Sequence, residues 1–299
     1  MKEQEIWNEV KSLHEFIMYK FDSENTAKNY CFHVKSFLLF FRHISRPSDI
    51  TAEMIINYIN QPRFSTQDSK RNVHSAIKFF YKWKCGHKES RKFKFIPYPK
   101  KEDKLPNPVT KEEFISIMKV CNNLKHKCVL MLAFDGGLRV SEVINLKIAD
   151  IDSKQMKITI RQSKGRKDRQ IKLSVILLKY LRDYAREYKP NLYLFNGQNG
   201  ELQYSIRSCQ KLFHNYAEKA GIKRKIKFHE NRHGYAMSLL ENGTDIERIK
   251  DLLGHSSSKT TRIYARMNNN VIQRELSPME QIVGANAIES KYNILHNAT

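Results

Sequence analysis

The sequence predicts a mainly helical protein of two domains, with a small β-hairpin or sheet in the second. Three observations predict this class. Apolar residues recur at helical spacing through most of the 299-residue chain. A basic, proline-containing stretch at 91–108 separates two such regions. Two short segments after it, 156–161 and 169–173, alternate apolar and polar residues, as the strands of a hairpin do.

The first domain, residues 1–90, should contain about four helices. Each carries a stripe of apolar side chains that can pack into a common core. The stripe of the first helix consists of Ile6, Val10, Leu13 and Ile17. Thr51 is a suitable N-cap for the third helix, which should end near Asn60, because the threonine hydroxyl can accept a hydrogen bond from a free backbone N–H.

Residues 91–108 are predicted to be an extended linker. Lysine and arginine dominate this segment, which also contains Pro97, Pro99, Pro106 and Pro108. Proline lacks a backbone N–H and fixes φ, so a regular helix cannot continue through these positions. We therefore place the boundary between the two domains here.

The second domain is expected at 109–274. Thr110 and Glu113 have the spacing of a capping box at the start of its first helix. The segment 124–134 is strongly apolar, which predicts a buried helix. After the hairpin, further helices are expected at 174–188, 205–220, 230–242 and 245–253. The remaining residues, 275–299, form a C-terminal tail with less basic character.

The charge of the chain indicates its class of partner. The formal net charge is +22 and the pI is about 9.7. Such an excess favours a polyanion, because each phosphate that a lysine or arginine neutralises releases condensed counterions. We interpret the charge as that of a nucleic-acid-binding protein.

The cysteines and the apolar segments indicate the compartment. The chain has five cysteines and no CxxC spacing, so we expect reduced thiols rather than disulfides or a zinc site. Its apolar stretches are too short to span a bilayer, and no signal peptide opens it. We expect a cytoplasmic, nucleoid-associated protein of a prokaryote, or of a virus in a prokaryotic host, with no membrane partner.

Five segments of the second domain carry cationic, imidazole or phenol groups in a fixed order. They are GGLRVSEVINL with Arg139, QSKGRKDRQIKL with Lys164, HENRHGYA with His229 and Arg232, LLGHSSSKTT with His255, and TRIYAR with Tyr264. In this order and approximate spacing they resemble the active site of the tyrosine recombinases, which include phage integrases and Xer-type enzymes. The resemblance covers about 108–270 closely and the N-terminal part loosely.

The resemblance implies a role for each of these residues. Arg139 and Arg232 would clamp a DNA phosphate, since a guanidinium offers a planar fork of donors and stays protonated. Tyr264 would attack the phosphorus and form a 3′-phosphotyrosine. Lys164 would protonate the departing 5′-oxygen. The remaining catalytic residues would be His229 and His255. The reaction would need no cofactor, metal or ATP.

Several assignments stay open at this stage. Lys167 is the rival of Lys164, and Tyr235 is the nearest rival of Tyr264 in the sequence. Glu142 either orients active-site groups or forms an exposed pair with Arg139 one turn away. The remaining supporting residue is His233, which would pack or orient.

One departure from the family's pattern concerns Asn231. It stands where the family usually has a leucine, and a buried amide there would need hydrogen-bond partners.

Further basic residues are candidates for contacts with the DNA backbone. They lie on the polar helix faces of the first domain, in the linker and in the hairpin turn. They are Lys70, Arg71, Lys92, Lys94, Arg166 and Lys167.

The resemblance also implies an architecture and an assembly. The first domain would be a SAM-like, core-DNA-binding domain, and both domains would close on double-stranded DNA as a C-shaped clamp. The protein would be a monomer or dimer when free and a homotetramer on two DNA sites, with possible accessory factors. The tail at 275–299 would dock on a neighbouring subunit.

The function expected from these residues is site-specific recombination that integrates or excises a mobile element or phage. Xer-type dimer resolution, topoisomerase IB-like relaxation and a catalytically silent DNA-binding regulator are the alternatives.

Overall fold

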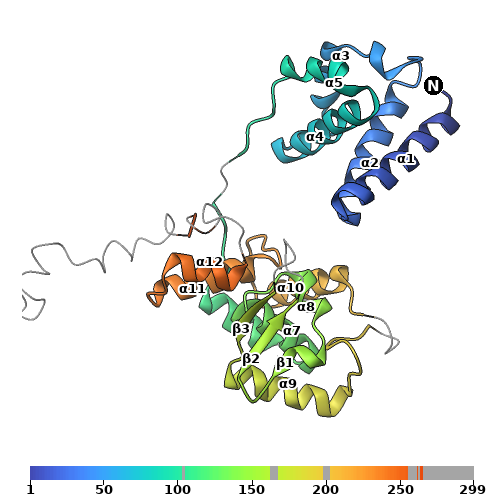
Figure 1. Cartoon of the computed structure of the whole chain (residues 1–299). Coiled ribbons are helices and arrows are strands. Elements are labelled where there is room, and N and C mark those ends of the chain that lie inside the picture. The colour runs from blue at the N-terminus through green and yellow to red at the C-terminus, as the bar shows by residue number, and fades with distance from the viewer. Residues whose placement is uncertain (103–104, 162–167, 198–202, 255–260, 262, 265–299) are drawn as a thin grey trace, which may run out of the picture. The chain divides into compact units, whose positions relative to one another are not determined.

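The computed structural model describes most of the chain. The described residues are 1–102, 105–161, 168–197, 203–254, 261, 263 and 264. They belong to two compact units, Met1–Lys104 (unit 1) and Leu105–Thr299 (unit 2). Helices dominate both units, and unit 2 contains a three-stranded antiparallel sheet (Figure 1). The mainly helical fold with a small sheet is therefore confirmed.

In its described part, unit 1 contains only helices. They are α1 (Glu3–Phe21), α2 (Glu24–Phe40), η1 (Pro47–Asp49), α3 (Ala52–Ile59), α4 (Gln67–Lys84), α5 (Gly86–Ser90) and η2 (Arg91–Lys94). The side chains of Ser23, Thr51 and Thr66 accept backbone N–H groups at the starts of α2, α3 and α4. The predicted cap of the third helix is thus confirmed. The predicted apolar stripe of α1 is buried in the core of the unit.

The first part of the predicted linker is folded onto unit 1. Its first residues form η2, and Phe93 and Ile96 are only 5% and 4% exposed within the core of the unit. A guanidinium nitrogen of Arg71 donates to the carbonyl of Pro99 at 3.0 Å. Burial of a large apolar side chain such as that of Phe93 or Ile96 stabilises the folded state by roughly 1.5–3 kcal/mol. Basic residues outnumber apolar ones in this segment, so its composition did not indicate this burial. The extended conformation predicted for 91–108 therefore does not hold for its first residues.

A buried histidine of α4 gives a testable statement about stability. His74 is 1% exposed, and neither ring nitrogen has a hydrogen-bond partner of normal geometry within residues 1–102. Its ring lies edge-on to Phe93 and Tyr98, with centroids 5.4 and 4.8 Å away. Burial, followed by the positive charge of Lys78, lowers the pKa of His74, although a backbone contact at Ile96 opposes the change. His74 is therefore buried in its neutral form.

We expect His74→Phe to stabilise the protein by about 1 kcal/mol, because it removes buried ring nitrogens without changing the packing volume greatly. The folded-state pKa lies below the unfolded value of about 6.5, so the unfolded state binds the proton more readily. Keeping His74 neutral therefore costs stability increasingly as the pH falls below about 6.5 and has no such cost above that value. Urea denaturation at pH 7.5 and 5.5 should show a weaker pH dependence in the variant than in the wild type.

The matched control is the exposed His43, whose replacement by phenylalanine should leave both midpoints nearly unchanged. A loss of stability in His74→Phe at both pH values would mean that the ring nitrogens make hydrogen bonds that the fold needs.

In unit 2, several helices pack around one apolar helix. Its elements are α6 (Lys111–Val120), α7 (Leu124–Asp135), α8 (Val140–Asn145), η3 (Ile148–Asp150), β1 (Ile151–Asp152), β2 (Lys157–Ile160), β3 (Arg169–Lys172), α9 (Val175–Tyr188), α10 (Ile206–Lys219), α11 (Glu230–Glu241) and α12 (Ile246–Leu253). The helix α7 is the predicted buried one and packs against α8, α9, α10 and α11. The capping box of Thr110 and Glu113 is present at the start of α6.

The sheet register determines which side chains of the hairpin point inward. Strand β2 pairs with β3 so that Ile158 lies opposite Ile171 and Ile160 opposite Arg169. On β3 the buried positions are Arg169 and Ile171, two residues apart, as alternation requires. A guanidinium is therefore buried on the same face of the strand as the apolar core residue Ile171.

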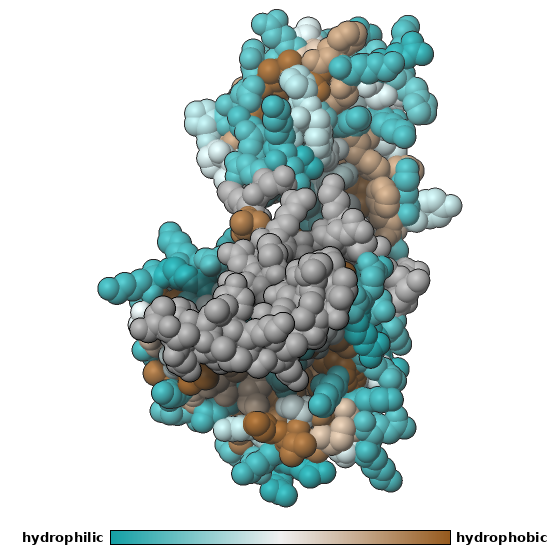
Figure 2. Space-filling view, turned by 90° about the vertical axis from the view of Figure 1, so that its left-hand side faces the viewer, coloured by the Kyte–Doolittle hydropathy of each residue, from teal (hydrophilic) through white to brown (hydrophobic). Residues whose placement is uncertain are grey.

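The surface is mostly polar. On the face shown in Figure 2, hydrophilic residues cover most of the coloured surface. Among the helices that the structure describes, none has the length and apolar character needed to cross a membrane.

Candidate active site

Arg139 stands at the N-cap of α8, one residue after Gly136 and Gly137. Gly137 has a φ of +60°, and a Cβ at this position would overlap the ring of Tyr235. The Arg139 backbone N–H donates to Glu142 Oε2 at 2.8 Å, and its Nη1 donates to Glu142 Oε1 at 2.7 Å. The sharp turn thus presents Arg139 next to the carboxylate one turn further along.

Glu142 is the centre of a cluster of three arginines. It is 8% exposed, so the alternative of an exposed pair with Arg139 is wrong. Arg169 donates to both carboxylate oxygens, from Nη1 at 2.8 Å and from Nη2 at 2.7 Å. Arg232 Nη1 lies 3.7 Å from Glu142 Oε2. Burial alone would raise the pKa of Glu142, but the hydrogen bonds and charge of Arg169, with Arg139 and Arg232, lower it to about 2.

Arg232 is held inside the protein. It is 0% exposed, its Nη1 donates to the carbonyl of Gly137 at 2.8 Å, and its Nη2 donates to the carbonyl of Leu253. Its Nε has no hydrogen-bond partner among the residues that the structure describes. Burial, followed by the charge of Arg139, lowers the pKa of Arg232 to about 9. Three guanidiniums facing one carboxylate leave an excess of positive charge, which is a setting that favours an anion.

Tyr264 is 1% exposed and contacts the helix that carries Arg232. Its hydroxyl lies 2.8 Å from Nδ1 of His233. Burial raises the pKa of Tyr264 to about 12, and the charges of Arg232 and Arg139 act in the opposite direction. Burial, followed by the charges of His229 and Arg232, lowers the pKa of His233 to about 4. At neutral pH the phenol is therefore protonated and the imidazole is neutral, so the phenol can donate to Nδ1.

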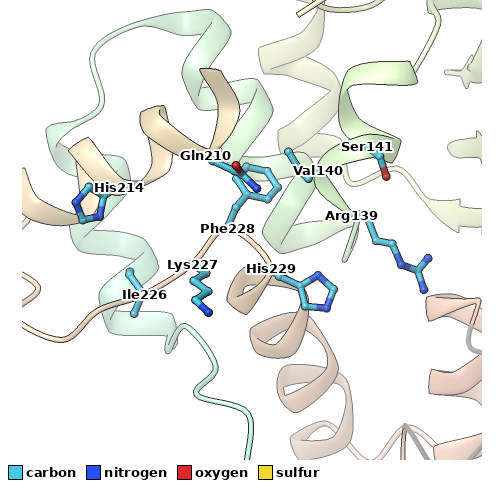
Figure 3. Close-up of a pocket in the computed structure, with 9 residues that line it drawn as sticks. All are labelled: Arg139, Val140, Ser141, Gln210, His214, Ile226, Lys227, Phe228 and His229. Carbon is cyan, nitrogen blue, oxygen red and sulfur yellow. The ribbon is translucent and has the colours of Figure 1, made fainter. Parts of the chain in front are cut away.

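His229 lies at the start of α11 and faces a cavity. Its ring is edge-on to that of His233, with centroids 4.9 Å apart. Burial, followed by Arg232 and Arg139, lowers the pKa of His229. Arg139 and His229 line a cavity of about 570 Å³ together with Lys227 and with Gln210 of α10 (Figure 3). Arg139 is thus the member of the arginine cluster that lines this cavity.

The structure therefore gathers most of the sequence-predicted site residues. One site contains Arg139, Glu142, His229, Arg232, His233 and Tyr264. The predictions on Lys164, Arg166, Lys167 and His255 lie outside the described residues. The rival Tyr235 packs against Gly137 and is half-buried.

The predicted DNA-backbone residues of unit 1 differ in their surroundings. Lys92 is used within the fold, because its Nζ donates to the carbonyls of Ser48 and Ile50 at 3.2 and 2.9 Å. Lys70 Nζ donates to Asn60 Oδ1 at 3.0 Å, whereas Lys94 is exposed. Lys92 is thus the least suited of these residues to a DNA contact.

The surroundings of Arg169 and Asn231 are features that the structure adds to the motifs. The motifs assign no role to Arg169, although its alternation with Ile171 on the predicted strand indicates an inward-facing side chain. Asn231 is fully buried, and its Nδ2 donates to the carbonyl of Phe228 at 2.9 Å. Its Oδ1 has no partner within the described part of the chain. The prediction that this buried amide needs hydrogen-bond partners is therefore met for Nδ2 but not, among the described residues, for Oδ1.

The described ranges contain no cluster of three or more His, Cys, Asp or Glu side chains arranged to hold a metal ion.

Comparisons with known proteins cover both units. Residues 107–270 match the phage integrase family, and residues 10–90 match the phage integrase N-terminal SAM-like domain. The tyrosine recombinase XerA of Pyrococcus horikoshii is 31% identical over 288 residues, which span 94% of this chain and 98% of XerA. The crystal structure of a XerA recombinase has a TM-score of 0.52 at 26% identity and covers 93% of this chain and 99% of that one. A lambda integrase tetramer bound to a Holliday junction has a TM-score of 0.69 at 17% identity and covers 84% of this chain and 77% of that one.

Proposed function

The chain belongs to the phage integrase family and is a tyrosine recombinase, a site-specific DNA recombinase, and from this premise we propose that it cleaves and rejoins DNA through a 3′-phosphotyrosine at Tyr264. The observation that carries the proposal is the position of this phenol. Its hydroxyl lies 2.8 Å from His233 Nδ1, on the helix that also holds the buried Arg232. A nucleophile beside a hydrogen-bond acceptor and fixed cations is the arrangement that such an attack requires.

The arginine cluster binds the scissile phosphate in this proposal. Arg139 reaches the cavity, and the Nε–H of Arg232 has no partner within the described residues. A buried donor without a partner calls for an explanation, and a phosphate oxygen supplies one. The non-bridging oxygens gain charge in the five-coordinate state, so fixed guanidiniums stabilise that state more than the ground state.

The cleavage step needs no reactant other than the protein and the DNA. The phenol oxygen of Tyr264 forms a bond to phosphorus, the bond from phosphorus to the 5′-oxygen breaks, and the 3′ end remains attached to the protein. The phenol donates toward Nδ1 of His233, and the bound phosphate offsets the positive charges that lower the pKa of His233. The departing 5′-oxygen takes up a proton, for which we propose Lys164. Rejoining is the same step in reverse with the 5′-hydroxyl of another strand.

The remaining site residues receive supporting roles. His229, at the edge of the cavity, donates to the phosphate, and His255 assists from its own segment. Glu142 orients the two arginines of the clamp. Contacts with the DNA backbone come from Lys94, Lys70 and Arg71 in unit 1 and from Arg166 and Lys167 in the hairpin. We leave Lys92 out of this set because its ammonium is used within unit 1.

We propose four protomers on two DNA sites as the active assembly. The likeness of the fold to a lambda integrase tetramer bound to a Holliday junction supports this proposal. Units 1 and 2 would then form the two halves of a clamp on double-stranded DNA, with 275–299 docking on a neighbouring subunit.

For the biological role we propose integration or excision of a mobile element. Resolution of chromosome or plasmid dimers is the second candidate, which the similarity to XerA over nearly the whole of both chains favours. Footprinting on the DNA beside the gene separates the two, since a recombinase of a mobile element should protect sites that flank its own coding region.

The reaction itself is tested with nicked duplexes that trap the covalent adduct. We expect a DNA-linked protein band on a denaturing gel and joining of strands from two different duplexes that carry the selected site. Relaxation of any supercoiled plasmid without strand exchange would instead indicate a type IB topoisomerase. DNA binding with no adduct at all would indicate a silent regulator and end the proposal.

A further inference from the structure

Among the three arginines around Glu142, Arg169 makes the most side-chain hydrogen bonds, and it has no role in the chemistry described above. Arg169 begins strand β3, and its side chain is 7% exposed. Its Nη1 and Nη2 donate to the two oxygens of Glu142 at 2.8 and 2.7 Å, and its Nε donates to the carbonyl of Leu252 at 2.9 Å. Each of its three nitrogens therefore donates to a protein partner, and the side chain offers little exposed surface to a phosphate.

The paired hydrogen bonds fix the plane of the Glu142 carboxylate. A guanidinium that bonds both oxygens in parallel allows the carboxylate one orientation, whereas a single bond leaves it free to rotate. The same carboxylate accepts from Arg139 Nη1 and backbone N–H at 2.7 and 2.8 Å and lies 3.7 Å from Arg232 Nη1. The direction in which Arg139 and Arg232 point thus depends on Glu142, and the orientation of Glu142 depends on Arg169.

The third hydrogen bond of Arg169 reaches the end of α12. The last carbonyls of a helix have no partner within the helix, and cations are favourable there. Arg169 donates to the carbonyl of Leu252 and Arg232 donates to that of Leu253, just before Gly254, which ends α12 in a left-handed conformation. The two guanidiniums therefore hold the helix end from which the chain continues to Tyr264.

We propose that Arg169 is a positioning residue for DNA cleavage, which acts through Glu142 and the end of α12 and does not contact DNA. It ties the hairpin strand β3 to the start of α8 and to the end of α12, three segments that each lead to a group of the reaction. This inference rests on the proposed function of the site.

The competing explanation is that Arg169 only stabilises the fold. A buried ion pair that loses one partner destabilises a protein strongly, so a fall in total activity alone does not distinguish the two. A positioning role predicts a slower cleavage step in protein that is folded and bound to DNA. A purely structural role predicts a smaller folded fraction that cleaves at the normal rate.

The experiment compares Arg169→Gln and Arg169→Lys with Arg161→Gln as the matched control. Arg161 belongs to the same hairpin and also pairs with a buried carboxylate, with its Nε 2.5 Å from Asp150 Oδ1, but its side chain is 58% exposed. For each variant, the rate of covalent adduct formation at saturating DNA and the dissociation constant are referred to the folded protein measured by thermal denaturation.

We expect Arg169→Gln to lower the adduct rate about 10- to 100-fold, the size found when a partner that orients a metal-binding side chain is removed. Its DNA affinity should change by less than about threefold, because no donor of Arg169 faces the DNA. Arg169→Lys keeps the charge without the planar fork and should recover only part of the rate. Arg161→Gln should resemble the wild type in both quantities.

A double variant tests the route through Glu142. If Arg169 acts through this carboxylate, Arg169→Gln combined with Glu142→Gln should be no slower than the slower single variant, because the two changes remove the same arrangement. If the rate reductions of the two single variants multiply in the double variant, the inference is overturned. It is also overturned if Arg169→Gln and Arg169→Lys form the adduct within about threefold of the wild-type rate per folded molecule. A wild-type protein that forms no adduct would instead overturn the proposed function.

Discussion

Replacement of Tyr264 by phenylalanine is expected to abolish covalent attachment to DNA while DNA binding persists. The substitution removes only the hydroxyl, which lies 2.8 Å from His233 Nδ1, and keeps the buried ring in place. No other oxygen occupies that position in the described site. The loss should be complete on a denaturing gel, and binding measured by fluorescence anisotropy should stay within about threefold of wild type, since the basic groups that meet the phosphates are unchanged.

Tyr235→Phe is the matched control for this experiment. Tyr235 belongs to the same helix as His233 and is half-buried, and its ring packs against Gly137. We expect this variant to form the adduct at nearly the wild-type rate. If the adduct survived in Tyr264→Phe and disappeared in Tyr235→Phe, the assignment of the nucleophile would be wrong.

The second large effect is expected from the arginine clamp. Arg139→Ala should slow cleavage about 100- to 1,000-fold, the usual effect of removing one preorganised donor from the developing charge. The side chain is 23% exposed, lines the cavity and, within the described residues, is paired only with Glu142, so the fold should persist. Single-turnover adduct formation with saturating DNA measures this effect directly.

Arg232→Ala should slow cleavage at least as strongly and should also destabilise the fold. Arg232 is fully buried and joins α11 to the carbonyls of Gly137 and Leu253. Its loss leaves a cavity and removes the donors to these two carbonyls, for which a cost of about 2–5 kcal/mol is typical. The exposed Arg186, which pairs with Asp183 on α9, provides the control and should change neither rate nor stability when replaced by alanine. Cleavage within a few-fold of wild type in both clamp variants would refute their assignment.

Much of the fold was predictable because its signals are local. The capping box of Thr110 and Glu113, the cap at Thr51 and the apolar helix α7 all depend on residues within a few turns of one another. The prediction failed at the start of the linker. There the buried Phe93 and Ile96 are two apolar residues among many basic ones, and their burial depends on a core formed by distant helices.

In the candidate site too, some features could be predicted from the sequence and others could not. The motifs identified Arg139, His229, Arg232 and Tyr264 by residue type and order, and the structure brings these four groups close together. The motifs gave no sign that Arg232 is fully buried, nor that Asn231 has a partner for its Nδ2 and none for its Oδ1 among the described residues.

By itself, the sequence determined which chemical groups are present, the order in which they occur and the helices that carry them. Only the tertiary structure decided that Arg169 of β3, Glu142 of α8 and Arg232 of α11 form one buried cluster. The reason is physical: a hydrogen bond between segments far apart in the chain leaves no periodic trace in the sequence. Burial, which sets the pKa of Glu142 and of Tyr264, is a property of the packed core and not of any one segment.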